Sequence, residues 1–240
     1  MKLLLDIGNS RIKWAWFDGV LQPGGAVSHR DHGPSAAFDS IALPRRPDQI
    51  WAASVAGGEL QKTAEAWARA AGQPVHWARS EAAGHGVTNA YQLAEQLGVD
   101  RWLALIAGYR RAGGAALIID AGTAITLDVV SAEGRHRGGL IAPGLTLQRL
   151  SLRQQTQLRP GEPGSLGWLA ADTNAAIGWG SLHAVVGLIE RVRTGIREDY
   201  GPMRQYVTGG EAGALLPCLQ GEWVHAPDLV LEGLALQASS

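Results

Sequence analysis

The sequence predicts an α/β protein made of two similar domains, and three observations support this prediction. The segment Leu3-Leu4-Leu5-Asp6-Ile7-Gly8-Asn9-Ser10 recurs 114 residues later as Leu117-Ile118-Ile119-Asp120-Ala121-Gly122-Thr123-Ala124. Apolar runs of strand length alternate with helix-like stretches, which is typical of the α/β class. A chain of 240 residues suits one large domain or two of half that size, and the repeat favours two. We therefore expect two domains, 1–114 and 115–240, divided at Gly113-Gly114.

The first half begins as a β-meander and continues with mixed elements. Its predicted strands are Lys2 to Leu5, Arg11 to Phe17 and Ala26 to His29, with a turn at Gln22-Pro23-Gly24-Gly25. One short helix is expected within residues 30–48. A strand from Ile50 to Val55, a helix from Glu59 to Ala71 and a helix from Asp100 to Ala112 follow, and the glycine pair after Ala112 ends the last of these.

The second half repeats this pattern. Its predicted strands are Leu117 to Asp120, Ala124 to Val130 and Arg135 to Ile141, and Ser131-Ala132-Glu133-Gly134 predicts a hairpin turn. Helices are expected near Thr146 to Thr156 and from Asn174 to Arg197, followed by a strand from Gln205 to Val207 and a final helix from Glu232. The glycines within the long helix would weaken it unless close packing, between domains or between subunits, compensates.

Each copy of the repeat has the composition of a phosphate-binding hairpin. Glycine lets backbone N–H groups approach phosphate oxygens, a small polar side chain adds a donor, and the aspartate can hold Mg²⁺ directly or through water. Two such loops facing each other would hold a nucleoside triphosphate. Lys13 follows the first loop, where its ammonium group could reach a phosphate oxygen, although a solvated strand lysine is an equally simple interpretation.

The composition favours a small charged ligand. The chain has 21 basic and 22 acidic residues and no basic run, so we expect no nucleic-acid partner. The single cysteine, Cys218, excludes an internal disulfide and indicates a cytoplasmic protein. No stretch approaches the roughly 18 apolar residues of a membrane-spanning helix, so we expect no membrane partner.

Five motifs occur in the order and spacing seen in type III pantothenate kinases. They are Asp6 to Lys13, Gly98-Val99-Asp100-Arg101, Asp120 to Ala124, Gly138 to Gly144 and Thr208-Gly209-Gly210. The chain resembles that family from residue 1 to about residue 215. The resemblance implies two ribonuclease H-like domains of the actin and sugar-kinase superfamily with a nucleotide cleft between them. It also implies transfer of the γ-phosphoryl group of ATP to the hydroxyl of pantothenate, the first step of coenzyme A biosynthesis.

The resemblance assigns roles to the residues of three of these motifs and to Tyr91 and Thr173. It implies that Asp100 is the catalytic base and that pantothenate contacts Tyr91, Gly98, Val99, Asp100, Arg101 and Thr173. It implies that ATP binds Asp6, Ile7, Gly8, Asn9, Ser10, Arg11, Ile12, Lys13, Gly122 and Thr123. Asp120 would hold a monovalent cation, K⁺ or NH₄⁺, and Asp6 would hold Mg²⁺. Family members are homodimers, so a second copy of the chain is an expected partner.

Most of these residues also have a purely structural interpretation. Asp100 and Thr173 each precede a predicted helix and would serve as N-caps, and Asp120 would bond to its own turn. Tyr91 would be a core or rim aromatic and Arg101 a surface or salt-bridged cation. The chain also has Glu95-Gln96-Leu97 where the family usually has a proline, which leaves the local backbone path open.

The functional alternatives are another small-molecule kinase of the superfamily or a non-catalytic transcriptional accessory factor, because a fold alone does not determine the substrate.

Overall fold

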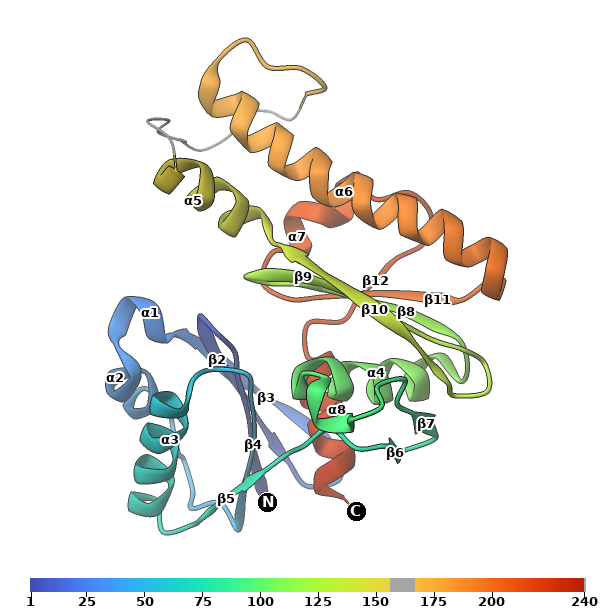
Figure 1. Cartoon of the computed structure of the whole chain (residues 1–240). Helices are drawn as coiled ribbons and strands as arrows, with labels where there is room; N and C mark the ends of the chain where they lie inside the picture. The colour runs from blue at the N-terminus through green and yellow to red at the C-terminus, as the bar shows by residue number, and fades with distance from the viewer. Residues whose placement is uncertain (156–166, 240) are drawn as a thin grey trace. The chain divides into compact units, whose positions relative to one another are not determined.

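The computed structural model describes residues 1–155 and 167–239, which form two compact units (Figure 1). Unit 1 joins Met1–Arg111, Gly134–His136 and the residues from Asp228 on. Unit 2 joins Ala112–Glu133 and Arg137–Pro227. The first change of unit lies close to the expected boundary at residue 114. The C-terminal helix, however, packs in unit 1, whereas the sequence predicted it within a second domain.

Unit 1 contains a mixed five-stranded sheet in the order β3-β2-β1-β4-β5. Its strands are β1 (Lys2–Ile7), β2 (Arg11–Phe17), β3 (Leu21–Ser28), β4 (Gln49–Ser54) and β5 (Val75–Trp77). Strand β1 is antiparallel to β2 and parallel to β4. The helices of this unit are α1 (His29–His32), α2 (Pro34–Asp39), α3 (Gly58–Ala70), α4 (Val99–Ala112) and α8 (Leu229–Ala238), and a small hairpin joins β6 (Ala83–Gly84) to β7 (Val87–Thr88).

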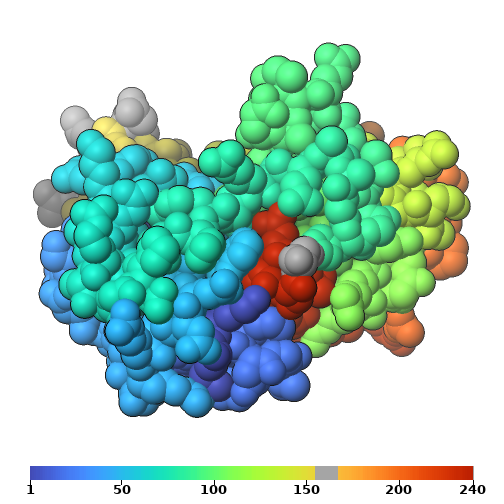
Figure 2. Space-filling view, turned by 90° about the horizontal axis from the view of Figure 1, so that it is seen from below, coloured from blue at the N-terminus to red at the C-terminus, as the bar shows by residue number. Residues whose placement is uncertain are grey.

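Helices cover both faces of this sheet. Leu3, Leu5 and Ile7 alternate along β1 and pack in one core with Phe38 of α2 and Ala64 of α3. The opposite face of β1 contacts α8, and the Lys2 Nζ atom donates a hydrogen bond to the carbonyl oxygen of Ala238. Figure 2 shows the C-terminal residues, in red, against the N-terminal residues, in dark blue. Helix α8 is apolar on most of its surface and is therefore buried almost throughout.

Unit 2 contains a second mixed five-stranded sheet, in the order β10-β9-β8-β11-β12. Its elements are β8 (Ala116–Ala121), β9 (Ala124–Val130), β10 (His136–Pro143), α5 (Leu145–Gln155), α6 (Thr173–Tyr200), β11 (Arg204–Thr208), α7 (Ala212–Leu215) and β12 (Val224–His225). Strand β8 is antiparallel to β9 and parallel to β11. The two copies of the repeat, β1–β2 and β8–β9, thus occupy equivalent places in the two sheets. Residue Thr156, the predicted end of α5, lies outside the described residues.

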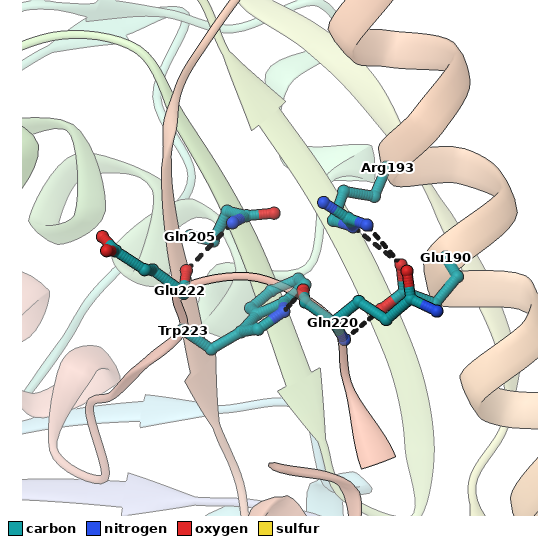
Figure 3. A network of polar contacts seen from close by, with 6 residues as sticks. All are labelled: Glu190, Arg193, Gln205, Gln220, Glu222 and Trp223. Atoms are coloured by element: carbon teal, nitrogen blue, oxygen red, sulfur yellow. Dashed lines mark hydrogen bonds and ion pairs between the residues drawn. The ribbon is translucent and has the colours of Figure 1, made fainter. Parts of the chain in front are cut away.

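Helix α6 is joined to the sheet of unit 2 by apolar and polar contacts. Leu117 and Ile119 of β8 pack with Val185 and Ile189 of α6. A polar network next to these apolar contacts consists of Glu190, Arg193, Gln205, Gln220, Glu222 and Trp223 (Figure 3). In it, Glu190 accepts hydrogen bonds from the Arg193 side chain, at 2.8 Å, and from the backbone N–H of Gln220, at 2.7 Å. These contacts hold the connection between β11 and β12 against α6.

The predicted turn at residues 22–25 is wrong, because these residues lie within β3. The chain reverses earlier, between β2 and β3, at residues 18–20. Gly24 is the extra residue of a β-bulge opposite Trp14 and Ala15. A Cβ added to Gly25 would lie 2.5 Å from the Trp14 ring, so these glycines permit a close approach rather than a turn. Pro23 is tolerated because β3 is an edge strand.

Candidate active site

The first repeat forms the hairpin between β1 and β2. Ile7 pairs with Ile12, so residues 8–11 make the loop, and the Gly8 backbone N–H donates to the Arg11 carbonyl oxygen at 3.0 Å. Asp6 pairs directly with Lys13, and directly paired side chains lie on the same face of a sheet. The expected carboxylate and ammonium groups are therefore neighbours at the base of this loop.

The predicted ATP-binding residues of this hairpin differ in exposure. Asn9 and Arg11 are exposed and Ser10 is half-buried. The side chains of Ile7 and Ile12 are fully buried in the core of unit 1. Contact between these two residues and ATP would therefore have to come from their backbone atoms.

Helix α1 holds the first loop from one side. The His29 backbone N–H donates to the Ser10 carbonyl oxygen at 3.2 Å, and Arg30 Nε donates to the Asn9 carbonyl oxygen at 3.2 Å. The His29 Nε2 atom lies 2.9 Å from the Gly8 carbonyl oxygen, which can only accept, so we assign the ring proton to this nitrogen. Two residues thus fix the carbonyl groups of three successive loop residues. Sequence analysis missed His29 and Arg30, because they follow the loop at no recognisable spacing.

The second repeat forms a tighter hairpin between β8 and β9. Ala121 pairs with Ile125, so the loop contains only residues 122–124, one residue fewer than the first loop. The Gly122 backbone N–H donates to the Ala124 carbonyl oxygen at 3.0 Å. Asp120, the equivalent of Asp6, pairs with Thr126. The second hairpin therefore has a threonine where the first has Lys13.

Asp120 lies in a row of polar side chains across three strands. Thr126 on β9 and Thr208 on β11 pair with it from either side, so their side chains share its face of the sheet. Thr208 is buried, and its hydroxyl group lies 3.4 Å from the Pro227 carbonyl oxygen. A Cβ added to Gly209 would clash with Asp120 Oδ1, so the Thr208-Gly209 turn lies directly against this carboxylate.

Glu211 connects the turn after β11 with the start of α5. Its backbone N–H donates to the Ala121 carbonyl oxygen at 2.8 Å. Its carboxylate accepts hydrogen bonds from the backbone N–H groups of Leu145, at 2.8 Å, and Thr146, at 3.0 Å. A carboxylate at a helix N-terminus satisfies backbone donors that have no partner within the helix. Glu211, which the sequence analysis also missed, therefore holds the second loop, the glycine turn and α5 together.

Asp100 lies in the first turn of α4 rather than at its cap. The helix begins at Val99, and the Trp102 backbone N–H donates to the Gly98 carbonyl oxygen at 3.0 Å, which makes Gly98 the residue at the N-terminal boundary. The Asp100 Oδ1 atom accepts from the backbone N–H of Arg101 at 2.7 Å. The alternative interpretation of Asp100 as an N-cap is thus wrong. The half-buried carboxylate lies at the positive end of the helix dipole.

Arg101 and Tyr91 form a hydrogen-bonded pair beside Asp100. Arg101 is only 6% exposed, so its interpretation as a surface cation is wrong. Its Nη1 atom donates to the Tyr91 hydroxyl oxygen at 3.1 Å, and its guanidinium carbon lies 5.8 Å from the centre of the Tyr91 ring. Tyr91 is half-buried. The structure therefore brings together two residues that the sequence analysis predicted as parts of one substrate site.

The segment without the family proline forms one turn of 3₁₀ helix, Ala94–Gln96. The Leu97 backbone N–H donates to the Ala94 carbonyl oxygen at 3.1 Å, and the Ser80 hydroxyl group donates to the Leu97 carbonyl oxygen at 2.7 Å. The Leu97 side chain is buried. The path into Gly98 is therefore fixed by hydrogen bonds and burial.

Thr173 is the first residue of α6 and is exposed. Its interpretation as the N-cap is wrong, because Asp172 caps the helix through a 2.9 Å hydrogen bond from the Ala175 backbone N–H to Asp172 Oδ1. The Thr173 side chain is therefore not needed as the cap. It belongs to unit 2, whereas Asp100 and Arg101 belong to unit 1.

Comparison with known proteins agrees with this arrangement of motifs. The model of the type III pantothenate kinase family matches residues 2–194. The chain belongs to the type III pantothenate kinase family. It is 40% identical to the type III pantothenate kinase of Nitrosococcus oceani, over 98% of this chain and 92% of that protein. It is also 40% identical to that of Halorhodospira halophila, over 98% and 96% of the two chains. The predicted family and its kinase activity are thus confirmed.

Solved structures confirm the predicted fold of this pantothenate kinase family member. A Baf family protein from Campylobacter jejuni covers 97% of this chain with a TM-score of 0.61 at 20% identity, and 94% of its own chain is covered. The activator of 2-hydroxyisocaproyl-CoA dehydratase from Clostridium difficile covers 99% of the chain with a TM-score of 0.54 at 12% identity, and 93% of its own chain is covered. The two sheets thus belong to ribonuclease H-like domains of the actin and sugar-kinase type.

Within the described residues, no helix is long and apolar enough to cross a membrane.

Proposed function

We propose that Asp100 is the general base with which this pantothenate kinase activates the hydroxyl group of pantothenate. Phosphoryl transfer depends mainly on alignment and on charge stabilisation, and a positioned carboxylate accepts the proton of the attacking hydroxyl. The observation that carries the proposal is the position of Asp100, in the first turn of α4 and next to the buried Arg101. The product, 4′-phosphopantothenate, is the first intermediate of coenzyme A biosynthesis.

Arg101 is the proposed partner of the pantothenate carboxylate. A guanidinium group binds a carboxylate through two parallel hydrogen bonds, and Arg101 is held by the Tyr91 hydroxyl at 3.1 Å. Gly98 and Val99 continue this site before Asp100, and the hydroxyl group of the exposed Thr173 is a further proposed contact of pantothenate.

The two repeat hairpins are the proposed sites for the phosphate groups of ATP. Lys13 supplies a positive charge at the first loop. At the second, Thr123 supplies a hydroxyl group, and Gly122, whose own N–H is used within the hairpin, lets a phosphate group approach the backbone. The support is the shared position of the hairpins in the two sheets and the hydrogen bonds that fix each loop. The use of ATP agrees with a cytoplasmic location.

The carboxylates fit the expected ions through the chemistry of their donor atoms. No three His, Cys, Asp or Glu side chains cluster as metal ligands in residues 1–155 and 167–239. The remaining ligands of each ion would therefore be hydroxyl groups, water or phosphate oxygens. Asp6 would hold Mg²⁺, and Asp120 with Thr126 and Thr208 would hold K⁺ or NH₄⁺ by oxygen atoms alone. Bound there, these cations would neutralise charge on the phosphate groups.

A second copy of the chain is the proposed partner of unit 2. Gly180 and Gly187 lie on the exposed side of α6, and a Cβ added to either would meet no atom of the described chain within 4 Å beyond the neighbouring backbone of the helix itself. Trp168 and Leu169, just before this helix, are 87% and 91% exposed. Packing of a second copy against α6 would compensate for the helix-weakening glycines and bury this apolar surface. We propose that Thr173 then serves the Asp100 site of the other copy.

The test of the proposed base is the Asp100→Asn variant. The amide oxygen can still accept the hydrogen bond from the Arg101 backbone, so the fold is expected to survive. We expect kcat for 4′-phosphopantothenate formation to fall by about 10²–10⁴-fold while ATP binding persists. Asp39→Asn, an exposed aspartate at the end of α2, is the matched control and should keep full activity. Near-normal turnover of the Asp100 variant would reject the assignment.

A further inference from the structure

His136 is a buried histidine beside the proposed pantothenate site. It is the first residue of β10, is only 4% exposed and belongs to unit 1. Its ring stacks on the Tyr91 ring with 6.1 Å between the ring centres and 5° between the ring planes. Aromatic stacking of this kind restricts the orientation of both rings.

His136 is itself held by the segment that precedes Tyr91. The Ala90 backbone N–H donates to His136 Nδ1 at 3.4 Å, so this nitrogen acts as the acceptor. Two residues earlier in each segment, the Thr88 backbone N–H donates to the Gly134 carbonyl oxygen at 2.8 Å, and Thr88 forms a parallel β-bridge with Arg135. The backbone on both sides of the stacked rings is therefore fixed.

Tyr91 links the His136 ring to Arg101, the residue proposed to bind the pantothenate carboxylate. Tyr91 connects His136, through its ring, with Arg101, through its hydroxyl group. Movement of the Tyr91 ring would move the oxygen atom that orients the guanidinium group. A displacement of the guanidinium group by about 1 Å would weaken its two parallel hydrogen bonds to a carboxylate.

We infer that His136 is a positioning residue for pantothenate: it fixes the Tyr91 ring and, through the Tyr91 hydroxyl, the Arg101 guanidinium group in the orientation that receives the carboxylate. This inference rests on the proposed substrate role of Tyr91 and Arg101. His136 itself need not touch pantothenate or ATP. Its loss should therefore weaken the binding of one substrate and leave the other unaffected.

The experiment compares steady-state kinetics for pantothenate and ATP in three variants of His136. His136→Ala removes the ring and the acceptor, His136→Asn removes the ring but keeps an acceptor for the Ala90 N–H group, and His136→Phe keeps a stacking ring. We expect Ala and Asn to raise KM for pantothenate by about tenfold without changing KM for ATP. The phenylalanine variant should recover most of this loss. If the alanine variant does not fold, the comparison of Asn with Phe tests the same point.

The chain offers a matched control in the same unit. His76 also stacks on an aromatic ring, that of Trp51, with 5.2 Å between ring centres and 19° between ring planes, but it is exposed and lies outside the substrate motif. His76→Ala should leave both KM values unchanged. An unchanged KM for pantothenate in His136→Asn, or an equal rise for both substrates, would overturn the inference.

A double-mutant cycle separates this inference from the proposed function. If His136 acts through Tyr91, adding His136→Ala to Tyr91→Ala should cause no further rise in KM for pantothenate. Two effects that multiply would overturn the inference and leave the substrate role of Tyr91 intact. If Tyr91→Ala alone leaves this KM unchanged, the proposed role of Tyr91 fails, and the inference fails with it.

Discussion

Asp6 on β1 lies directly opposite Lys13 on β2 in the antiparallel register. The equivalent aspartate of the second repeat, Asp120, lies opposite Thr126, because the second loop is one residue shorter. Two hairpins with nearly the same sequence thus place different chemistry beside their aspartates. The first combines a carboxylate with an ammonium group, and the second combines a carboxylate with hydroxyl groups.

Lys13→Gln should weaken the use of ATP. The substitution removes a charge-assisted contact with a phosphate group, which typically contributes about 1.5–3 kcal/mol, so kcat/KM for ATP should fall by about 10- to 100-fold. Measurement of initial rates at varied ATP, with saturating pantothenate, tests this. Lys62→Gln makes the same change at an exposed position of α3 and should have no effect. Equal kinetics of the two variants would mean that Lys13 is only a strand lysine.

Asp120→Ala should remove the activation of the enzyme by monovalent cations. We expect the parent protein to be faster in K⁺ or NH₄⁺ than in Na⁺ at equal ionic strength, because a site formed by a carboxylate and hydroxyl groups selects cations by size. The variant should show the same low rate in all three salts. Thr126→Val should weaken the dependence on K⁺ without abolishing it.

Two outcomes of the same measurements would contradict this cation site. If the parent protein has equal rates in the three salts, Asp120 holds no activating cation. If the salt preference survives in Asp120→Ala, the cation acts elsewhere.

Glu211→Ala should destabilise unit 2. It leaves the backbone N–H groups of Leu145 and Thr146 without their carboxylate partner at the start of α5. Loss of such a cap costs about 1–2 kcal/mol, which lowers Tm by about 2–8 °C in a protein of this size. Thermal unfolding followed by circular dichroism measures the change. Glu222→Ala, an exposed residue of the same unit, is the control, and an equal Tm for the two variants would contradict the role of Glu211.

The repeat was the part of the fold most readily predicted from the sequence. Apolar runs such as Leu3 to Leu5 and Leu117 to Ile119 are buried strands, and β9 occupies the predicted range. The glycine run in β3 misled the prediction, because glycine marks turns and close approaches alike and only the neighbouring Trp14 distinguishes them. The short strands β5 and β12 were missed, since two or three residues carry no periodicity.

The candidate site was predicted from residues that lie close to one another in the sequence. Motif spacing predicted Tyr91, Asp100 and Arg101 as site residues, and in the structure Arg101 donates a hydrogen bond to Tyr91. His136 and Glu211 were missed, because their partners lie 46 and 66 residues away in the sequence. Contacts at such separations depend on how strands pair, which local propensity does not encode. The half-buried His29 of α1, missed for the same reason, supports the first loop across 21 residues.

The last prediction concerns the second copy of the chain. Asp100→Asn removes the proposed base, and Thr173→Tyr fills the proposed site from α6 with a larger side chain. Each variant alone should be inactive as a homodimer. If the site joins Asp100 of one copy to Thr173 of the other, a mixed dimer with two-fold symmetry regains one intact site of two. Random pairing makes about half of the dimers mixed, so roughly a quarter of all sites should recover.

Refolding the two variants together and measuring 4′-phosphopantothenate formation tests this shared site. Mass spectrometry or differential tags must show that mixed dimers form, because the expected recovery assumes that about half of the dimers are mixed. If Asp100 and Thr173 of the same copy served one site, every site in a mixed dimer would keep one damaged residue and activity would stay absent. Mixed dimers without activity would therefore reject the shared site, whereas the family membership and the role of Asp100 would be unaffected, since each rests on separate observations.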